Sequence, residues 1–342
     1  MNILLILTGG TIACKTVNST MEPAPENALD ILRMYRAENP YCDINFIIEQ
    51  PFTILSENYT AEAYNMLIDF ISEIKASDYD GIIITHGSDT LSYTSALIGM
   101  LMRNTDIPIM ITAADYPLDN QCSNGLSNFS ACVEFIRKKL SGGIFTVYGE
   151  KNKPVVYLST RICEADPLND RFSPFGDGVI AEFENGSLKN FNTALAEKLK
   201  NQRHSDNFFI SKPVIKNDVL LIKNYPNQNF NFYNISGAKA VVIYMYHSAT
   251  ACTTGKNTNI CRFIEKCNSE KIPVYLASFK HRKEKYATSS EIEKYNAAKL
   301  FNISKECAYI KALLAFNQCG LSPDYVMNSD IYFESDNSLS GE

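Results

Sequence analysis

The order of apolar and polar positions along the chain predicts short buried strands that alternate with amphipathic helices. Wholly apolar runs such as 81–85 have the length of strands in a parallel sheet that is covered on both faces. Strands are predicted at 3–8, 44–49, 81–85, 108–112 and 143–147, and helices near 29–37 and at 90–103 and 127–139. This alternation indicates an α/β fold whose first part is a doubly wound, mostly parallel sheet.

A further helix is predicted between the second and third of these strands. Thr60 is its expected N-cap, because a hydroxyl there can accept a hydrogen bond from the first turn. Spacings of three and four residues predict that one face is buried. The residues expected on that face are Met66, Leu67, Phe70, Ile71 and Ile74.

The second half of the chain repeats the α/β pattern after a polar stretch. Strands are predicted at 219–223, 240–246 and 273–278, and helices at 259–269 and 305–318. We therefore expect two α/β domains, at 1–189 and 219–334, joined by a linker at 190–218 and followed by a disordered tail at 335–342.

Composition narrows the classes of partner. The chain has 342 residues, 45% apolar, with a net charge of −6 and no basic block, which argues against nucleic-acid binding. Ten cysteines without a CxxC pair indicate buried thiols of a reducing compartment, and four histidines without metal-ligand spacing argue against zinc. The apolar run at 3–7 is too short for a signal core or a membrane span. We expect a cytoplasmic protein that acts on a small molecule.

Two turns that follow predicted strands carry hydroxyl groups. TGGT, at 8–11, follows the first strand, and THGSDT, at 85–90, ends the strand at 81–85. Ligands of parallel sheets bind outside the carboxyl ends of the strands, so both turns should face one crevice. One hydroxyl could attack an acyl carbon there, while backbone N–H groups hold the oxyanion and the other turn manages protons.

These motifs resemble the two signatures of the bacterial L-asparaginases. LTGGTIA and THGSDTLSYTSA match them, and PIMITAAD, SNGLSNFSAC and ISKECAYIKALLAF are similar to later segments of the cytosolic, two-domain type. The resemblance implies hydrolysis of L-asparagine to L-aspartate and ammonia, no cofactor or metal, no membrane, and a homodimer or homotetramer.

The resemblance also implies the roles of individual residues. Thr11 matches the nucleophile, Ser88 the second catalytic hydroxyl, and Asp89 the carboxylate that recognises the α-amino group. The substrate-binding residues expected beside them are Gly10, Ser56, Glu57, Gly87 and Ala113. His86 and His247 are expected to be structural.

The sequence departs from the family pattern at three places. The family has a catalytic lysine about 70 residues after its second signature, whereas the matching position here is Cys163 or Glu164, depending on the register. The S-D-G segment carries Asn124 in place of its carboxylate, and the family's mobile loop, here CKTVNSTMEPAPEN, lacks tyrosine. Arg161 stays protonated and cannot act as a base, so Lys15 is the one nearby amine that could replace the lysine. We expect asparagine turnover below that of lysine-containing relatives.

Two alternatives stand beside an asparaginase. A non-catalytic descendant could use the same cleft to bind an amino acid or amide. The tRNA-dependent amidotransferase component of this superfamily is a more distant interpretation, since it carries extra sequence before TGGT. A nicotinamide-dependent enzyme is rejected because no GxGxxG follows a strand.

Overall fold

Each of two compact units in this chain has its own parallel sheet. The computed structural model describes residues 1–17, 20–23, 29–201, 208–209, 211–280 and 284–336. The units are Met1–Asn207 and Phe208–Glu342. The boundary between them falls within the stretch predicted as a linker. Among the described residues, no helix is both long enough and apolar enough to cross a membrane.

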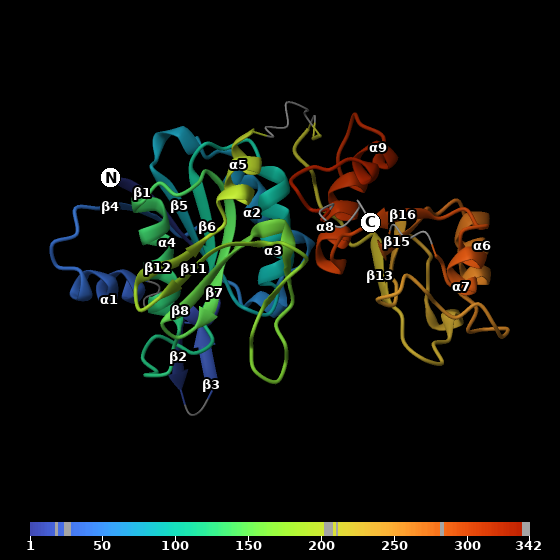
Figure 1. The fold of residues 1–342 in the computed structure, drawn as a ribbon, viewed down its shortest axis with the longest axis horizontal. Coiled ribbons are helices and arrows are strands. Elements are labelled where there is room, and N and C mark those ends of the chain that lie inside the picture. The colour runs from blue at the N-terminus through green and yellow to red at the C-terminus, as the bar shows by residue number, and fades with distance from the viewer. Residues whose placement is uncertain (18–19, 24–28, 202–207, 210, 281–283, 337–342) are drawn as a thin grey trace. The chain divides into compact units, whose positions relative to one another are not determined.

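The first unit is built on an eight-stranded sheet whose central part is parallel (Figure 1). Its parallel strands, in spatial order, are β7 (Gly143–Glu150), β6 (Pro108–Thr112), β5 (Gly81–Thr85), β1 (Asn2–Leu7) and β4 (Asn45–Glu49). Every residue of β5 and β6 is buried, as the wholly apolar runs predicted. The predicted α/β fold with a mostly parallel sheet is confirmed.

The other edge of this sheet is antiparallel and was not predicted. It consists of β8 (Lys153–Leu158), β11 (Val179–Glu184) and β12 (Ser187–Phe191). Tight turns connect the hairpins, and Asn185 and Gly186 both have positive φ, of 49° and 75°. An Asn-Gly pair between two strands is a recognised hairpin signal, so the sequence contained this information.

Helices cover both faces of the sheet. Figure 1 shows α1 (Asp30–Glu38) and α4 (Gly125–Arg137) on one face and α2 (Ala61–Ser72) and α3 (Leu91–Leu101) on the other. Thr60 holds the N-cap position of α2, but its side chain makes no capping hydrogen bond to the backbone.

The buried face of α2 differs from the predicted one. Its buried residues are Ala63, Tyr64, Leu67, Ile68 and Ile71. Met66, predicted to be inside, is 45% exposed, and Phe70 and Ile74 are only partly buried. Leu67 and Ile71 are buried as predicted, but Tyr64 and Ile68 are buried where Met66 and Phe70 were expected. Apolar residues occupy more than one face of this helix, so packing against the rest of the unit decides which of them are covered.

Two segments thought irregular have regular structure. Within the predicted linker, α5 (Thr193–Asn201) is a helix that buries Leu195 and Leu199 and packs against β11. In the predicted mobile loop, β2 (Cys14–Val17) pairs with β3 (Thr20–Pro23), although part of that loop lies outside the described residues. Apolar residues four apart in a short polar stretch were too weak a signal for a helix.

The second unit has a four-stranded, wholly parallel sheet. Its strands, in spatial order, are β13 (Val219–Lys223), β14 (Ala240–Tyr244), β15 (Val274–Phe279) and β16 (Ala298–Phe301). Its helices are α6 (Ile260–Ser269), α7 (Ala287–Ile292), α8 (Lys305–Phe316) and α9 (Pro323–Asn328). Asn259 and Ser304 cap α6 and α8 with their side chains, and α6 buries Ile260, Cys261, Phe263, Ile264 and Cys267.

A buried ion pair holds the last described segment of the chain. Lys311 of α8 and Glu334 are both almost fully buried, with 2.7 Å between Nζ and the carboxylate. Burial alone would raise the pKa of Glu334, but the charge of Lys311 and a hydrogen bond from the Ile331 N–H help to lower it to about 2. Asp336, assigned to the tail from sequence, is also buried, and its N–H donates to the Asn302 carbonyl. The ordered chain therefore continues into the predicted tail, whose remainder, 337–342, lies outside the described residues.

Candidate active site

The two hydroxyl-bearing turns leave the sheet side by side. Strands β1 and β5 are neighbours with Leu7 opposite Thr85, so the turns begin at the same level. Thr8 is buried, and its hydroxyl donates to the Thr85 carbonyl at 2.7 Å. The first threonine of TGGT thus fastens the turn to the neighbouring strand, which leaves the second free for chemistry.

Glycines at 10 and 87 bring the turns into backbone contact. Gly10 has a φ of 78°, and a Cβ placed on it would overlap the backbone of Gly87. A Cβ on Gly87 would in turn overlap the Ser56 hydroxyl. Three residues that the sequence assigned to the site are therefore packed against each other, at a separation that only glycine permits.

A third segment joins this contact through backbone hydrogen bonds. Ile54 donates its N–H to the Thr8 carbonyl at 3.0 Å, and its own carbonyl accepts from the Gly10 N–H at 3.2 Å. Two residues later, Ser56 begins a short 3-10 helix, Ser56–Asn58. Thr90, at the end of the THGSDT turn, donates its hydroxyl to the Ser56 carbonyl at 2.9 Å.

Thr11 stands at the start of a single 3-10 turn, Thr11–Ala13. The Ala13 N–H donates to the Gly10 carbonyl at 2.9 Å, and Ile12 and Ala13 are buried beneath the turn. Thr11 itself is partly exposed. The candidate nucleophile is thus a hydroxyl at the surface of a turn whose other residues anchor it.

Carboxylates gather around the same place. Asp89 is exposed as a whole, but partial burial of its carboxylate, together with the charges of Glu57 and Asp170, raises its pKa. Burial raises the pKa of the Cys14 thiol, and Glu57 adds to this shift. Glu57 is therefore within electrostatic reach of both the Thr11 segment and Asp89. Ser88 lies between Gly87 and Asp89 and is partly exposed.

Ala113 is the predicted site residue that offers least to a ligand. It follows β6 and is fully buried, and its carbonyl already accepts a hydrogen bond from the Asn128 side chain at 3.1 Å. A ligand could use only the second lone pair of that carbonyl.

His86 is buried beneath the THGSDT turn. Burial lowers its pKa to about 4, and its Nδ1 lies 2.8 Å from the Gly87 carbonyl, which can only accept. The ring is therefore neutral at neutral pH, with its proton on Nδ1. The Tyr59 ring lies 4.7 Å away, between centroids, and the Tyr59 hydroxyl approaches the Thr8 hydroxyl at 3.5 Å. These contacts agree with the structural role expected for His86, and they add Tyr59, which sequence reasoning missed.

Glu164 is one of the two residues that match the family's lysine. Its carboxylate accepts a hydrogen bond from the Tyr93 hydroxyl at 2.7 Å. Tyr93 belongs to α3, the helix that follows Asp89 directly. The other residue, Cys163, pairs with Ser173 in the small β9–β10 sheet, Ile162–Cys163 with Ser173–Pro174. Arg161 is buried, and its guanidinium donates to the Asp177 carbonyl.

Asn124, the second departure from the family pattern, has a structural task. Its side-chain oxygen accepts the Asp115 N–H at 3.0 Å, and its side-chain nitrogen donates to the Gly149 carbonyl at 2.8 Å. The Asp115 carboxylate accepts the Asn124 N–H in return, at 2.9 Å. An amide is needed here, because a carboxylate could not donate to Gly149 and would face Asp115.

Comparison with known families supports the resemblance. The model of the asparaginase N-terminal domain matches residues 2–195. The L-asparaginase of Thermococcus kodakarensis superposes with a TM-score of 0.76 at 19% identity, over 99% of this chain and 100% of that chain. L-asparaginase I of Vibrio cholerae superposes with a TM-score of 0.76 at 18% identity, over 98% of this chain and 99% of that chain.

Curated relatives carry two different names. A glutamyl-tRNA(Gln) amidotransferase component of Methanosphaera stadtmanae is 25% identical over 99% of this chain and 78% of its own length. The corresponding amidotransferase component of Methanococcus maripaludis is 27% identical over 71% of this chain, and the match spans only 58% of that relative. The L-asparaginase of T. kodakarensis is 27% identical over 49% of each chain.

The backbone contact at Gly10 can be tested with a matched glycine. Gly186 has nearly the same φ, 75°, but nothing lies within 4 Å of a Cβ placed there. We expect Gly186→Ala to lower the free energy of unfolding by about 1–2 kcal/mol, the cost of a left-handed residue. Gly10→Ala should cost clearly more, because the Gly87 backbone must also move.

Chemical denaturation of both variants, followed by circular dichroism, measures the difference. Equal losses of stability would show that the two turns do not depend on this contact.

Proposed function

Because the chain belongs to the asparaginase family, we propose that it is an amidohydrolase that converts L-asparagine to L-aspartate and ammonia through an acyl-Thr11 intermediate. The observation that carries this proposal is the mutual contact of Gly10, Gly87 and Ser56. This contact joins the segments that carry Thr11, Ser88, Glu57 and Asp89 at the carboxyl end of the sheet, where parallel sheets bind ligands, and it supports a common site for these residues.

The reaction proceeds in two steps. The Thr11 hydroxyl oxygen attacks the side-chain amide carbon, its proton passes by way of the Ser88 hydroxyl to the leaving nitrogen, and the C–N bond breaks to release ammonia. Water then attacks the ester, which returns the proton to Thr11 and releases aspartate. The buried Thr8 hydroxyl takes no part, since its proton is held by the Thr85 carbonyl.

The carboxylates of the site favour substrates that carry an ammonium group. An amino acid amide carries an ammonium group, which Glu57 and Asp89 attract. Partial burial of Asp89, together with repulsion from Glu57 and Asp170, raises the pKa of Asp89. The resemblance assigns binding of the α-carboxylate to Ser56, which packs against Gly87. Binding the ammonium group relieves the repulsion between the two carboxylates, so the same contact provides both affinity and a preference for zwitterionic amides.

A second candidate function is binding with little or no turnover. The hydrogen bond from Tyr93 to Glu164 favours it, because an acceptor-only carboxylate occupies a place that matches the family's lysine. The names of the curated relatives also make glutamine a substrate to test. Ammonia release from asparagine and from glutamine separates these functions from simple ligand binding.

Replacing the nucleophile tests the mechanism. Thr11→Ala should lower kcat by roughly 10⁴-fold or more, as loss of the nucleophile does in other acyl-transfer enzymes. The unfolding transition should stay in place, since the Thr11 side chain is partly exposed.

Thr11→Ser is the matched control and should keep measurable ammonia release, because it retains a hydroxyl. Unchanged activity in Thr11→Ala would remove Thr11 from the reaction, and absence of ammonia release by the wild-type protein from either amide would refute the proposal as a whole.

The pH dependence tests the paired carboxylates. As pH falls through the raised pKa of Asp89, this group protonates and ceases to attract the ammonium group, so kcat/KM should fall on the acid side. Glu57→Gln removes one cause of the raised pKa. It should therefore move the acid limb to lower pH and raise KM more than it lowers kcat.

Glu38→Gln, an exposed change in α1, should leave the profile as it is in the wild type. If Glu57→Gln shifts neither KM nor the acid limb, Glu57 lies outside the binding site.

A lysine introduced at position 164 tests whether the missing general base limits the rate. General-base assistance is worth about 10²–10⁴ in rate, so Glu164→Lys should raise kcat by roughly 10²-fold if the lysine's place has been taken by Glu164. Glu197→Lys makes the same change of charge at an exposed position of α5 and should have no such effect. Steady-state ammonia release measures both. A Glu164→Lys variant no faster than Glu197→Lys would show that another group handles the proton.

A further inference from the structure

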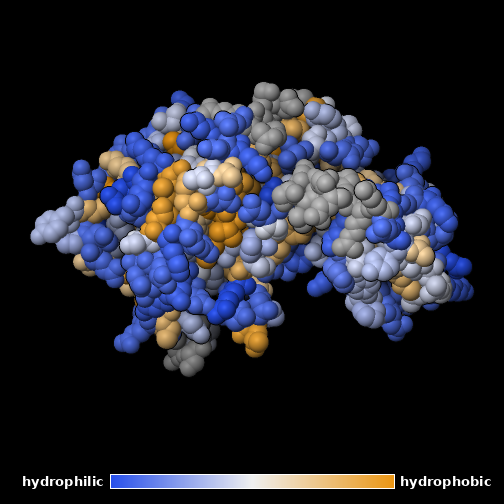
Figure 2. Space-filling model, in the orientation of Figure 1, coloured by the Kyte–Doolittle hydropathy of each residue, from blue (hydrophilic) through white to orange (hydrophobic). Residues whose placement is uncertain are grey.

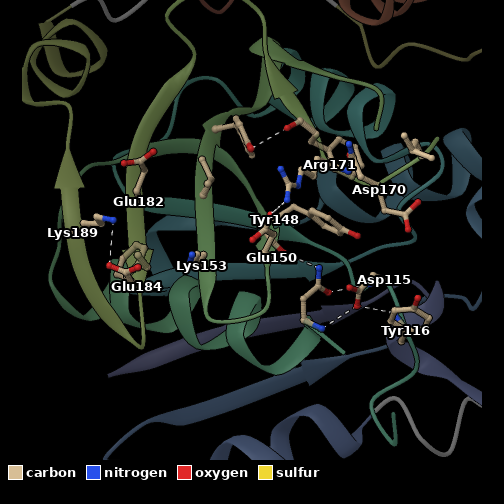
Figure 3. Close-up of a pocket in the computed structure, with 18 residues that line it drawn as sticks. Asp115, Tyr116, Tyr148, Glu150, Lys153, Asp170, Arg171, Glu182, Glu184 and Lys189 are labelled. Carbon is tan, nitrogen blue, oxygen red and sulfur yellow. Dashed lines mark hydrogen bonds and ion pairs between the residues drawn. The ribbon is translucent and has the colours of Figure 1, made fainter. Parts of the chain in front are cut away.

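A cavity opens within the first unit beside the candidate active site. Its volume is about 580 Å³, and strands β7, β8 and β11 form its wall together with the segment 168–172 (Figure 3). None of the roles assigned above uses this cavity. Its size is within the range of pockets that hold small organic molecules.

The Tyr148 hydroxyl marks the cavity as a binding site. The side chain is only 3% exposed, and its hydroxyl has no hydrogen-bond partner of normal geometry in the described part of the chain. The Asn124 side chain is close enough to lower the pKa of Tyr148, but no hydrogen bond of normal geometry joins the two groups. A buried hydroxyl without a partner costs about 1–3 kcal/mol, which a ligand that bonds to it would recover.

The charges around Tyr148 are acidic. Five carboxylates and three basic side chains line the cavity, and two of the bases are already paired, Arg171 with Glu150 and Lys189 with Glu184. Figure 3 shows the hydroxyl end of Tyr148 directed toward the part of the cavity where Asp115 and Asp170 lie. Burial raises the pKa of Tyr148, and the nearby charges of Asp115, Asp170 and Asp89 raise it further. This end of the cavity suits a cation.

Part of the cavity lining is apolar. The apolar residues that line the cavity begin next to Tyr148, since Val155 is its partner across β7 and β8 and the Phe172 ring lies 4.7 Å from its ring, between centroids. Tyr157 and Phe183 continue this lining, and Figure 2 shows hydrophobic colouring over the face that carries β8 and β11. An apolar wall that ends in carboxylates and an unpaired hydroxyl matches a short alkyl chain that ends in an ammonium group. A free anion would meet an excess of negative charge, and a neutral sugar would find few unpaired donors.

We propose that this cavity binds a primary alkylammonium group, carried either by an extended amide substrate of the Thr11 site or by a separate diamine ligand. Asp89 connects the two places, because it belongs to the candidate active site and its charge also acts on Tyr148. An extended amide substrate as the carrier of the ammonium group rests on the proposed function, whereas binding of the ammonium group in this cavity does not.

Calorimetric titration of the whole protein tests binding without turnover. Diaminopentane should bind at least about tenfold more tightly than pentanediol, which has the same length but no charge. Tyr148→Phe should weaken diaminopentane binding about fivefold or more. It should not lower the unfolding transition, because it removes a hydroxyl that has no partner.

Tyr157→Phe provides the matched control within the same cavity. The Tyr157 hydroxyl donates to the Phe172 carbonyl at 3.3 Å, so this variant should lose stability and keep most of its affinity for diaminopentane. Equal binding of the diamine and the diol, no binding of either, or an unchanged affinity in Tyr148→Phe would overturn the proposal.

A second measurement distinguishes the two sources of the ammonium group. If an extended substrate carries it, the aminopentyl amide of aspartate should show a lower KM than the pentyl amide, and diaminopentane should compete with asparagine. If the diamine binds without competing, it is a separate ligand. Diamine binding by a protein that releases no ammonia would refute the proposed function and support the cavity as a site.

Discussion

The approach of Gly10 to Gly87 is the constraint on which the candidate site depends. Strands β1 and β5 bring the two turns to one edge of the sheet, but the sheet spacing alone leaves room for ordinary side chains between them. The absence of a Cβ at both positions lets the backbones touch and lets Ser56 pack against Gly87. Hydrogen bonds from Thr8 and Ile54 then hold the arrangement, so Thr11 and Ser88 are carried by one rigid cluster.

A second theme is the acidic character of this edge of the first unit. The charges of Glu57 and Asp170 both act on Asp89, and Glu164 adds a carboxylate that accepts a hydrogen bond from Tyr93 of α3. Such a site attracts ammonium groups and disfavours anions whatever the reaction. Of these charges, Asp89 and Asp170 also act on Tyr148 in the cavity described above.

Some features missed from the sequence had a signal and others had none. The Asn185-Gly186 pair indicates the hairpin at the antiparallel edge, and this signal can be read from the sequence. The pairing of Tyr93 with Glu164 joins residues 71 positions apart, and no local pattern contains it. The two hydrogen bonds between Asn124 and Asp115 likewise follow from the folded structure and not from a local pattern. They explain why an amide stands where the family pattern has a carboxylate.

The sequence by itself determined the α/β class and the central strands, because fully buried strands need continuous apolar runs. It also determined that TGGT and THGSDT lie close together, because parallel strands place their carboxyl-terminal turns on one edge of the sheet. Tertiary structure alone decided which face of α2 is buried, that Asp336 packs inside, and that Tyr148 has an unpaired hydroxyl in an acidic cavity. These outcomes depend on which surfaces meet, and a periodic pattern shows how wide an apolar stripe is without showing what will cover it.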